Sequence, residues 1–334
     1  MKAIIPVAGA GTKLRPLTYT QPKALIPIAG KTILSVIVDQ LLDAGVTDFV
    51  FVIGYLGEKI QRYVAKTYPN LKYTIVNQED RKGTGHAIWL TKDAIQDEEV
   101  VIVLGDTVCD YNVSDVINSS VSQIGVKKVD DPRSFGVVEL DSKDRVVKAV
   151  EKPLIPKSNL AMVGVYYIKE TKELFDALEK NMNSRMDEEG EYHLTNALEY
   201  MIEHHHIQFN AFKVNNWFDC GKKETLLSTN AILLKEMSEV KGESDKPYHF
   251  DTSVIIPPVS IAEGCKIHNS IIGPNVTIGE YTTVQSAIIK DSIIGSYAEL
   301  TEVVLHSSII GSDAFVRGLS QSLNIGDNTE IDLG

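Results

Sequence analysis

The sequence predicts an α/β fold with a Rossmann-like, mostly parallel sheet that has helices on both faces, followed by a left-handed parallel β-helix. Two observations lead to this prediction. Strand and helix patterns alternate through the first two-thirds of the 334 residues, which is typical of a parallel sheet with helical crossovers. Beyond residue 250 an aliphatic residue returns about every six positions, which is typical of stacked coils.

The elements of the first part follow from apolar runs and the turn residues between them. Val100–Leu104 is a continuous apolar run, so we expect a central strand that is buried on both faces. In such sheets ligands bind beyond the carboxyl ends of the strands, where the loop after the first strand and Gly105-Asp106 both fall. The expected strands are residues 3–7, 48–53, 71–76, 100–104 and 207–214, and the expected helices are residues 33–44 and 58–68.

Residues 251–334 carry the second pattern. The tetrapeptide Ser-Ile-Ile-Gly occurs at 270–273, 292–295 and 308–311, which disfavours the alternative of an ordinary β-rich domain with short strands. If each face takes about six residues and points one aliphatic side chain inward, the segment forms roughly four to five coils of about eighteen residues. Residues 238–250 are polar and contain Gly and Pro, so we expect a linker between domains of residues 1–237 and 251–334.

The composition narrows the classes of partner. The net charge is −12 at pH 7 and the pI is about 5.2, which argues against a nucleic-acid polymer as ligand. No apolar stretch is long enough to span a membrane, and we find no signal-peptide pattern. Cys109, Cys220 and Cys265 are far apart in the sequence, so we expect a reducing compartment such as the cytoplasm, without a disulfide or zinc framework.

The loop of residues 9–23 is the most informative segment for function. Gly9 and Gly11 allow a sharp turn that leaves backbone N–H groups facing a ligand. The cationic residues of the loop are Lys13, Arg15 and Lys23. A flexible, donor-rich and locally cationic loop suits the triphosphate of a nucleotide. An ordinary strand-turn with surface lysines is the alternative.

Two common phosphate-binding loops do not match this segment. Leu14 stands where a dinucleotide fingerprint needs its third glycine, and no Walker sequence occurs in the chain. Instead, Gly-x-Gly-Thr-x-Leu-Arg-Pro-Leu-Thr, followed by Pro-Lys-Ala-Leu-Ile-Pro-Ile at 22–28, resembles the signature of sugar-1-phosphate nucleotidyltransferases, also called nucleotide-sugar pyrophosphorylases. The resemblance covers the first 235 residues or so and extends to the repeats, which resemble hexapeptide repeats.

The resemblance implies a reaction and a cofactor. An NTP and a sugar-1-phosphate would give a nucleotide-sugar and pyrophosphate. Asp106 in Leu-Gly-Asp and Asp219 in Trp-Phe-Asp-Cys-Gly resemble the family's two metal ligands, although a lone Asp after a strand is more often a turn or helix cap. Converging carboxylates repel each other unless a cation lies between them, and Mg²⁺ prefers such hard oxygen ligands. The catalytic residues that this resemblance predicts are Lys13, Arg15, Lys23, Asp106 and Asp219.

The same resemblance implies the binding residues. The nucleotide would contact Ala8, Gly9, Ala10, Gly11 and Thr12 of the loop and the base-reading residues Gln78, Gly83 and Thr84. The sugar phosphate would contact Gly136, Glu151, Lys152 and, in a turn at 162–166, Val163 and Gly164. The segment 190–196, Gly-Glu-Tyr-His-Leu-Thr-Asn, either caps a helix at 196–203 or lines the sugar pocket. The histidines at 204–206 favour a solvated helix end over a metal site.

Gln78 guides the choice of base. Its amide offers both a donor and an acceptor, which one pyrimidine edge can satisfy, whereas a guanine needs more room and a further acceptor. Gln78 followed by Gly-Thr-Gly-His-Ala at 83–87 also resembles the thymidylyl- and uridylyl-transferring members of the family more than the guanylyl-transferring ones. The resemblance therefore implies dTTP or UTP with glucose-1-phosphate. GTP with mannose-1-phosphate is the alternative, because the Arg-Pro-Leu-Thr loop, the Trp-x-Asp-x-Gly segment and the β-helix also resemble mannose-1-phosphate guanylyltransferases.

Two alternatives come from other classes of protein. One is a non-catalytic regulatory subunit on the same fold, which Lys13 supports because the family has Arg, with its planar fork, at this position. The other is acyl transfer by the β-helix, with His268 and His306 as bases. A short β-helix leaves strand edges and apolar core exposed at its ends, so we also expect a homo-oligomer, most simply a dimer, through the β-helix.

Overall fold

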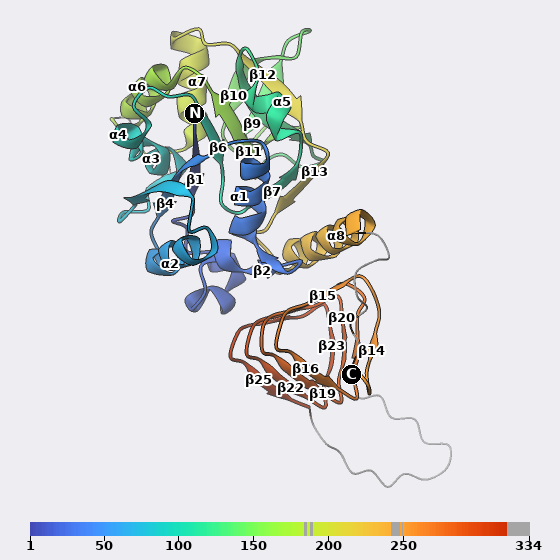
Figure 1. Cartoon of the computed structure of the whole chain (residues 1–334). Helices are drawn as coiled ribbons and strands as arrows, with labels where there is room; N and C mark the ends of the chain where they lie inside the picture. The colour runs from blue at the N-terminus through green and yellow to red at the C-terminus, as the bar shows by residue number, and fades with distance from the viewer. Residues whose placement is uncertain (184–185, 188–189, 242–247, 249, 319–334) are drawn as a thin grey trace. The chain divides into compact units, whose positions relative to one another are not determined.

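The computed structural model describes residues 1–183, 186–187, 190–241, 248 and 250–318 (Figure 1). The chain divides into two compact units, Met1–Thr229 and Asn230–Gly334, and each has a hydrophobic cluster of its own. Among the described residues, no helix has both the length and the apolar character needed to cross a membrane.

A nine-stranded sheet forms the centre of the first unit. Its strands are β1 (Lys2–Pro6), β4 (Asp48–Ile53), β5 (Lys72–Asn77), β6 (Val100–Val103), β8 (Ser122–Lys128), β9 (Val137–Leu140), β10 (Arg145–Val150), β11 (Leu160–Ile168) and β12 (Phe209–Lys213). They are ordered β5-β4-β1-β6-β11-β8-β12-β10-β9. Only β10 and β11 are reversed relative to β1, so seven of these nine strands run in one direction, and the predicted mostly parallel sheet is confirmed.

The burial of the central strands explains their continuous apolar sequences. All four residues of β6 are buried, and β6 lies between β1 and β11. Because side chains alternate along a strand, Ile4 and Val50 point to one face of the sheet and Ile5 and Phe51 to the other. All four of these side chains are fully buried. Both faces of the sheet are therefore covered, as predicted.

Helices provide this cover. The described helices are α1 (Ile33–Asp43), α2 (Gly57–Thr67), α3 (Gly83–Trp89), α4 (Lys92–Ile95), α5 (Val113–Ile117), α6 (Thr171–Met182), α7 (Leu194–His204) and α8 (Lys223–Lys241). Helices α3, α6 and α7 contact one another and pack on the face to which Ile4 and Val50 point. Figure 1 shows α1 and α2 lying apart from these three helices. The hydroxyl of Thr32 begins α1 by accepting the N–H of Ser35 at 3.1 Å.

Several shorter elements complete this unit. They are β2 (Pro27–Ile28), β3 (Lys31–Thr32), β7 (Thr107–Asp110), β13 (Asn216–Asp219) and the 3₁₀ turns η1 (Thr12–Leu14), η2 (Leu17–Tyr19) and η3 (Lys23–Leu25). Strands β7 and β13 form an antiparallel pair in which Asp219 lies opposite Thr107. Asp219 comes after the expected strand at 207–214, which is β12, but it lies on a further short strand, β13, that the sequence did not predict. The chain turns after β12, where the N–H of Asn215 donates to the carbonyl oxygen of Asp110 at 2.9 Å and begins the pairing.

Helix α8 continues into the segment that the sequence predicts as a linker. Residues 238–241 are helical, so the first part of the predicted linker is the end of α8. The segment is polar but has no Gly or Pro before Gly242, and Lys235 and Glu239 lie one turn apart with Nζ and Oε1 at 3.9 Å. Residues 242–247 and 249 lie outside the described part of the chain. The division between domains at 237 and 251 stays a prediction.

The second unit contains a left-handed parallel β-helix, as predicted. Its described strands are β14 (Val254–Ile255), β15 (Val259–Ile261), β16 (Lys266–His268), β17 (Ile271–Ile272), β18 (Val276–Ile278), β19 (Thr283–Gln285), β20 (Ile288–Lys290), β21 (Ile293–Ile294), β22 (Glu299–Thr301), β23 (Val304–His306), β24 (Ile309–Ile310) and β25 (Phe315–Arg317). They form three parallel sheets of four strands each. Ile267, Val284 and Leu300 stack in register and are buried, as expected for inward positions.

The coils are shorter than the eighteen residues expected. Ile272 pairs with Ile289, 17 positions later, and Ile289 pairs with Leu305, 16 positions later. The prediction of coil length is wrong because several faces take five residues instead of six, as between the inward positions Ile289 and Ile294. The later aliphatic positions, Ile325 and Ile331, lie outside the described residues.

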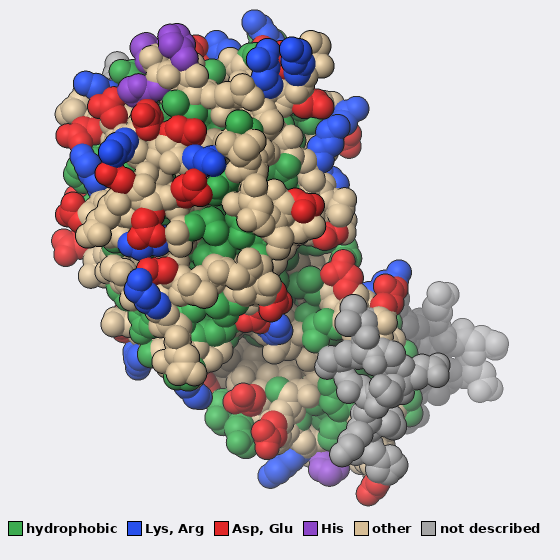
Figure 2. All heavy atoms as spheres, turned by 45° about the horizontal axis from the view of Figure 1, so that its top comes forward, with side chains coloured by type: hydrophobic (Ala, Val, Ile, Leu, Met, Phe, Trp, Pro, Cys, Tyr) green, Lys and Arg blue, Asp and Glu red, His purple; other side chains and the backbone are tan. Residues whose placement is uncertain are grey.

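Charged side chains are mixed over the surface. Figure 2 shows basic and acidic side chains interspersed on the face in view, with no stripe of basic side chains among the described residues drawn there. A mixed face of this kind, on a chain with a net charge of −12, offers no continuous track to a polyanion.

Candidate active site

The loop after β1 is held closed by its own residues. Gly11 has a φ of +60°, and a Cβ built there would lie 3.0 Å from Cγ2 of Thr18 and 3.1 Å from Cβ of Lys23. The hydroxyl of Thr18 donates to the carbonyl oxygen of Gly11 at 2.8 Å. Glycine is therefore required at this position. No atom lies within 4 Å of a Cβ built on Gly9, so the backbone there is open to a ligand.

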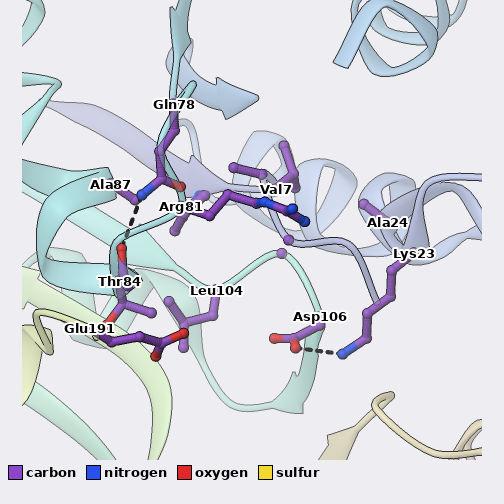
Figure 3. A pocket seen from close by; sticks show the side chains of 15 residues that line it. Val7, Lys23, Ala24, Gln78, Arg81, Thr84, Ala87, Leu104, Asp106 and Glu191 are labelled. Carbon is purple, nitrogen blue, oxygen red and sulfur yellow. Dashed lines mark hydrogen bonds and ion pairs between the residues drawn. The ribbon is translucent and has the colours of Figure 1, made fainter. Parts of the chain in front are cut away.

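A cavity of about 250 Å³ lies at the carboxyl ends of β1 and β6 (Figure 3). We call it the Gln78 cavity. This position is the one expected for a ligand site in an α/β sheet. The predicted site residues on its wall are Ala8, Gly9, Lys23, Gln78, Gly83, Thr84 and Asp106.

The side chain of Gln78 is oriented by two acceptors. Its Nε2 lies 3.1 Å from the carbonyl oxygen of Gly83 and 3.1 Å from Nδ1 of His86. Burial, and then the charge of Lys82, lower the pKa of His86, so the neutral ring accepts at Nδ1. A carbonyl oxygen only accepts, so the NH₂ group of Gln78 faces Gly83 and its amide oxygen faces the other way. Figure 3 shows this oxygen on the side of the cavity where Arg81 lies. With both N–H groups engaged, Gln78 presents an acceptor to a ligand.

A second cavity, of about 270 Å³, adjoins the first. We call it the Glu151 cavity. Strand β9 begins at its wall, β10 ends there and β11 passes along it. The predicted site residues that line it are Thr84, Asp106, Gly136, Glu151, Lys152, Val163, Gly164 and Asp219.

The carboxylate of Glu151 is held in the wall of this cavity. The hydroxyl of Thr195 donates to Oε2 of Glu151 at 2.5 Å. A Cβ on Gly136 would lie 2.9 Å from that Oε2 and 2.4 Å from Cε of Met162, so a larger residue here would displace the carboxylate or the Met162 side chain. Burial, and then the charge of Glu151, raise the pKa of Tyr166. The hydroxyl of Tyr166 therefore stays protonated next to Glu151.

Two backbone irregularities shape the Glu151 cavity. Gly164, at a φ of +84°, lies where the pairing of β11 with β8 shifts register between Met162 and Tyr166. The expectation of a turn at 162–166 is therefore wrong, because strand pairing continues on both sides of the irregularity and the strand does not reverse. Lys152 has a φ of +39°, and its N–H donates to the carbonyl oxygen of Phe135 at 3.1 Å. Non-glycine residues with left-handed backbone conformations are found preferentially at functional sites.

The two cavities meet at Asp106. The residues that line both are Thr84, Leu104, Asp106 and Glu191. The ammonium nitrogen of Lys23 lies 2.5 Å from Oδ2 of Asp106 (Figure 3). A Cβ on Gly105 would lie 2.2 Å from Cγ1 of Val7. Glycine thus lets the end of β6 approach the loop after β1 and brings Asp106 to Lys23.

Asp219 is the second carboxylate at this junction. It lines the Glu151 cavity, and the N–H of Cys220 donates to the carbonyl oxygen of Asp106 at 3.1 Å. Burial, and then the negative charge of Asp106, raise the pKa of Asp219. The charges of Lys23 and Lys13 act in the opposite direction. The two acidic residues are 113 positions apart in the sequence but close enough in the fold for their charges to repel each other.

This donor set fits a magnesium ion. Within the described residues no group of three or more His, Cys, Asp and Glu side chains forms a metal site, so a cation here would rest on the two carboxylates of Asp106 and Asp219. Mg²⁺ commonly takes one or two carboxylates and completes its shell with phosphate oxygens and waters. A divalent cation would also relieve the repulsion that raises the pKa of Asp219.

Two of the predicted catalytic residues line neither cavity. Lys13 and Arg15 are exposed, and the guanidinium of Arg15 lies 5.0 Å from the centroid of the Tyr19 ring. The charge of Lys13 still lowers the pKa of Asp219. Among the other predicted loop residues, Ala10, Gly11 and Thr12 also lie outside the two cavity walls. The structure therefore gathers Lys23, Asp106 and Asp219 and leaves Lys13 and Arg15 at the exposed surface of the loop.

Sequence reasoning missed Arg81. Its side chain lines the Gln78 cavity (Figure 3), and its guanidinium lies 6.0 Å from the centroid of the Tyr55 ring. Glu-Asp-Arg-Lys at 79–82 reads as a solvated, charged loop. The signal that could have found it is its place between Gln78 and Gly83, the two residues predicted to contact the base.

The segment 190–196 and the histidines at 204–206, 268 and 306 lie in different surroundings in the structure. In the segment 190–196, Glu191, His193 and Thr195 line the Glu151 cavity, while α7 begins at Leu194 without a side-chain cap. The segment thus lines a cavity, and that this cavity is the sugar pocket stays a prediction. Helix α7 ends at His204, as expected for a helix end. His268 and His306 lie on β16 and β23, in different sheets of the β-helix.

Comparisons with known proteins agree with this architecture. Residues 2–236 match the family model described as nucleotidyl transferase, and residues 239–332 match the one described as GlmU-like, C-terminal hexapeptide. The chain is 35% identical over 258 residues to the bifunctional protein GlmU of Methanocaldococcus jannaschii, covering 77% of this chain and 60% of that protein. It is 30% identical over 286 residues to a glucose-1-phosphate thymidylyltransferase of Streptomyces antibioticus, covering 83% and 77% of the two chains.

Two further similarities extend the comparison. The low-salt glycan biosynthesis nucleotidyltransferase Agl11 of Haloferax volcanii is 29% identical over 320 residues, covering 88% of this chain and 87% of that protein. A crystal structure of UDP-glucose pyrophosphorylase complexed with UDP-glucose shares the fold, with a TM-score of 0.60 and 24% identity over 70% of this chain and 98% of that one. The chain spans only 60% of the GlmU protein of M. jannaschii. It belongs to the nucleotidyl transferase family and carries a GlmU-like hexapeptide domain at its C-terminal end.

Proposed function

We propose that this protein transfers a nucleotidyl group from an NTP to a sugar-1-phosphate and releases pyrophosphate. The observation that carries the proposal is that two separate cavities share a wall at Asp106. A transfer between two bound substrates needs them held apart except at the atoms that react. In this account the NTP occupies the Gln78 cavity and the sugar-1-phosphate occupies the Glu151 cavity, so the α-phosphate lies at the junction. The names of the thymidylyltransferase and nucleotidyltransferase relatives support this assignment.

The residues of the junction suit the charge changes of this reaction. An oxygen of the sugar phosphate attacks the α-phosphorus in line, and the bond to the leaving pyrophosphate breaks. Lys23 would hold the triphosphate together with the open backbone at Gly9, and Lys152 would hold and orient the attacking phosphate. Most of the rate acceleration would come from positioning and charge neutralisation, because the protein forms no covalent bond.

Asp106 and Asp219 would hold Mg²⁺. When bound, the ion supplies positive charge that offsets the charge developing at the α-phosphate and on pyrophosphate. The two carboxylates must be ionised to bind it. Because burial and Asp106 raise the pKa of Asp219, Asp219 is the carboxylate whose ionisation limits binding at acidic pH.

The oxygen of Gln78 favours a uracil or thymine base. Uracil and thymine present an N3–H donor that this oxygen can accept, whereas cytosine has a lone pair at N3. Guanine presents two adjacent donors, N1–H and the exocyclic amine, and one amide oxygen leaves one of them without its own acceptor. We therefore propose dTTP or UTP as the donor. Glucose-1-phosphate is the proposed acceptor, which the name of the thymidylyltransferase relative supports.

A substrate matrix tests the proposal. The purified chain is incubated with Mg²⁺ and each of UTP, dTTP, CTP, GTP and ATP, paired with glucose-, galactose-, mannose- and N-acetylglucosamine-1-phosphate, and pyrophosphate release is measured. We expect the highest kcat/KM for UTP or dTTP with glucose-1-phosphate, and no release when either substrate is left out. A maximum for GTP with mannose-1-phosphate would overturn the base and sugar but keep the reaction class. Nucleotide binding without turnover for any pair would favour a regulatory subunit.

A further inference from the structure

His193 lies between two carboxylates in the wall of the Glu151 cavity. Its Nε2 is 2.5 Å from Oδ2 of Asp187, and its Nδ1 is 3.6 Å from Oε1 of Glu151. The residue is only 7% exposed. The first contact is a short hydrogen bond, whereas the second is too long for one and is an ion pair only when the ring is protonated. The imidazole ring therefore links a carboxylate outside the predicted site to one inside it.

The ring has little freedom to move. The Asn181 side chain donates from Nδ2 to the carbonyl oxygen of His193 at 2.9 Å in a buried position. Oδ1 of Asp187 accepts the N–H of Glu191 at 2.7 Å, so the carboxylate that holds the ring is itself oriented. Helix α7 begins at the next residue, Leu194. The position of Nδ1 is thus set by the scaffold and not by solvent.

The same segment is anchored to the Gln78 cavity. The N–H of Tyr192 donates to the carbonyl oxygen of Lys82 at 2.8 Å, and the N–H of Gly85 donates to the carbonyl oxygen of Tyr192 at 2.7 Å. A Cβ on Gly83 would lie 2.6 Å from that oxygen of Tyr192, so the two segments pack without a gap. Residues 191–195 are consequently fixed on one side by the base-reading loop and contact Glu151 on the other.

Both oxygens of Glu151 are oriented by this one segment. Oε2 accepts the hydroxyl of Thr195 at 2.5 Å, and Oε1 faces Nδ1 of His193. A carboxylate that accepts a hydrogen bond at one oxygen and lies against a fixed ring at the other has little freedom to rotate. A site can discriminate between sugars that differ in the direction of one hydroxyl only if its acceptors are fixed in this way.

We propose that His193, held by Asp187, is a positioning residue that orients the Glu151 carboxylate toward the hydroxyl groups of a hexose-1-phosphate and sets the selectivity among such sugars. This inference rests on the proposed function, because it takes the Glu151 cavity as the acceptor site. His193 acts through Glu151 and not on the reacting phosphates. Its loss therefore alters acceptor binding and leaves donor binding unchanged.

Two substitutions separate the contacts of the ring. His193→Gln keeps an N–H group for Asp187 but has no group at the place of Nδ1, and His193→Leu removes both contacts. We expect each to raise the KM for glucose-1-phosphate by about tenfold, the effect of losing one polar contact to a charged group, with the KM for the NTP unchanged. The ratio of kcat/KM for glucose-1-phosphate over mannose-1-phosphate should fall. In a Glu151→Gln background, His193→Gln should have no further effect on the KM for the sugar phosphate.

His205 provides the matched control. Its Nε2 lies 3.0 Å from Oδ2 of Asp176 at the other end of α7, outside both cavities. His205→Gln therefore removes a histidine–aspartate pair of the same kind from the same helix, and it should leave both KM values and the sugar ratio unchanged. Thermal melts of all variants show whether they are folded.

The outcomes distinguish this inference from the proposed function. If the wild type turns over but His193→Gln raises both KM values alike, leaves the sugar ratio unchanged, or adds its full effect to Glu151→Gln, the inference is overturned. If no pair of substrates turns over, the proposed function fails, and calorimetric titration with glucose-1-phosphate decides the inference alone. Binding that is about tenfold weaker in His193→Gln than in the wild type supports it. Equal binding, or none to the wild type, overturns it.

Discussion

Nζ of Lys23 and Oδ2 of Asp106 lie 2.5 Å apart, although 83 positions separate the two residues in the sequence. The side chain of Lys23 is only 14% exposed, whereas that of Asp106 is 41% exposed. A largely buried ammonium group needs a counter-charge, and Asp106 supplies it in the protein without ligand. In our account the triphosphate replaces Asp106 as the partner of Lys23 and leaves the carboxylate to Mg²⁺. The ion pair thus holds the junction of the two cavities ready for both ligands.

Asp219→Asn should stabilise the metal-free protein at neutral pH. Burial and the charge of Asp106 raise the pKa of Asp219, so the folded state binds the proton more tightly than the unfolded state does. The stability of the folded protein therefore falls as the pH rises from the ordinary aspartate pKa of about 3.9 through the raised value. In EDTA at pH 7 we expect the Tm of the variant to exceed that of the wild type by a few degrees, and the difference should vanish near pH 4. A lower Tm of Asp219→Asn at pH 7 without metal would contradict the assigned electrostatics.

Lys13→Arg should be tolerated, and Lys13→Ala should raise the KM for the NTP or lower kcat. Lys13 is exposed and lines neither cavity, but its charge acts on Asp219. Arginine keeps this charge and adds a planar fork for phosphate, whereas alanine removes the charge. Steady-state kinetics with varied NTP measure the effect. Lys59→Ala, which removes a half-buried lysine that donates to the carbonyl oxygen of Thr20, is a control for the loss of a nearby positive charge. An Ala variant at position 13 that equals the wild type would show that this lysine takes no part.

Gln78→Ala should reduce discrimination among bases more than it reduces phosphate binding. The amide oxygen of Gln78 is the acceptor that favours an N3–H group, and the donors of the same amide are held by Gly83 and His86. We expect the ratio of kcat/KM for UTP over CTP to fall about tenfold or more, the scale of one lost specific hydrogen bond. Inhibition by pyrophosphate, which reports phosphate binding, should stay the same. An unchanged ratio of UTP to CTP would remove Gln78 from base recognition.

The β-helix should carry the interface of a homo-oligomer. On the outer face of the sheet β14-β17-β20-β23, four aliphatic residues lie in register: Val254, Ile271, Ile288 and Val304, with exposures of 56%, 38%, 45% and 73%. Such an exposed apolar row is unfavourable in a monomer. Light scattering should give a mass of at least a dimer for the intact chain and a smaller mass for the variant with Ile288→Lys and Val304→Lys. Gln285→Lys, on the exposed side of a different sheet, should change nothing. A monomeric wild type, or a double variant of unchanged mass, would refute the interface.

Much of the fold was predictable from the sequence because burial dictates it locally. Val100–Leu104 is apolar throughout because β6 is buried on both faces, and the repeated Ser-Ile-Ile-Gly reflects inward aliphatic positions in the β-helix. Details that depend on chain geometry were not predictable. The bulge at Gly164 and the strand that carries Asp219 follow from hydrogen bonds between segments far apart in the sequence.

In the candidate site, too, some residues were predictable from local motifs and others were not. Gln78, Glu151 and Asp106 were found through the motifs that surround them, and the structure lines the two cavities with them. The sequence pattern includes His193 only as one position of the segment 190–196. The contacts of its ring with Asp187 and Glu151 arise from the tertiary fold, and no local pattern encodes them. Arg81 was missed for a related reason, since a charged residue in a polar loop looks solvated until the cavity is known. Sequence patterns thus report local burial and motifs, whereas cavity walls are assembled by tertiary contacts.

The most direct test of the central claim follows the α-phosphate. UTP or dTTP labelled with ³²P at the α-position is incubated with glucose-1-phosphate, Mg²⁺ and the wild type, Asp106→Asn, Asp219→Asn or the control Asp48→Asn, whose carboxylate pairs with Lys72 outside both cavities. We predict that the wild type and Asp48→Asn move the label into a nucleotide-sugar, with one pyrophosphate released per label and none in EDTA. Each junction variant should be slower by at least about a hundredfold, the scale of losing one electrostatic contact made in the transition state. Label that stays in the nucleotide with every acceptor, or junction variants that turn over like the wild type, would contradict the account.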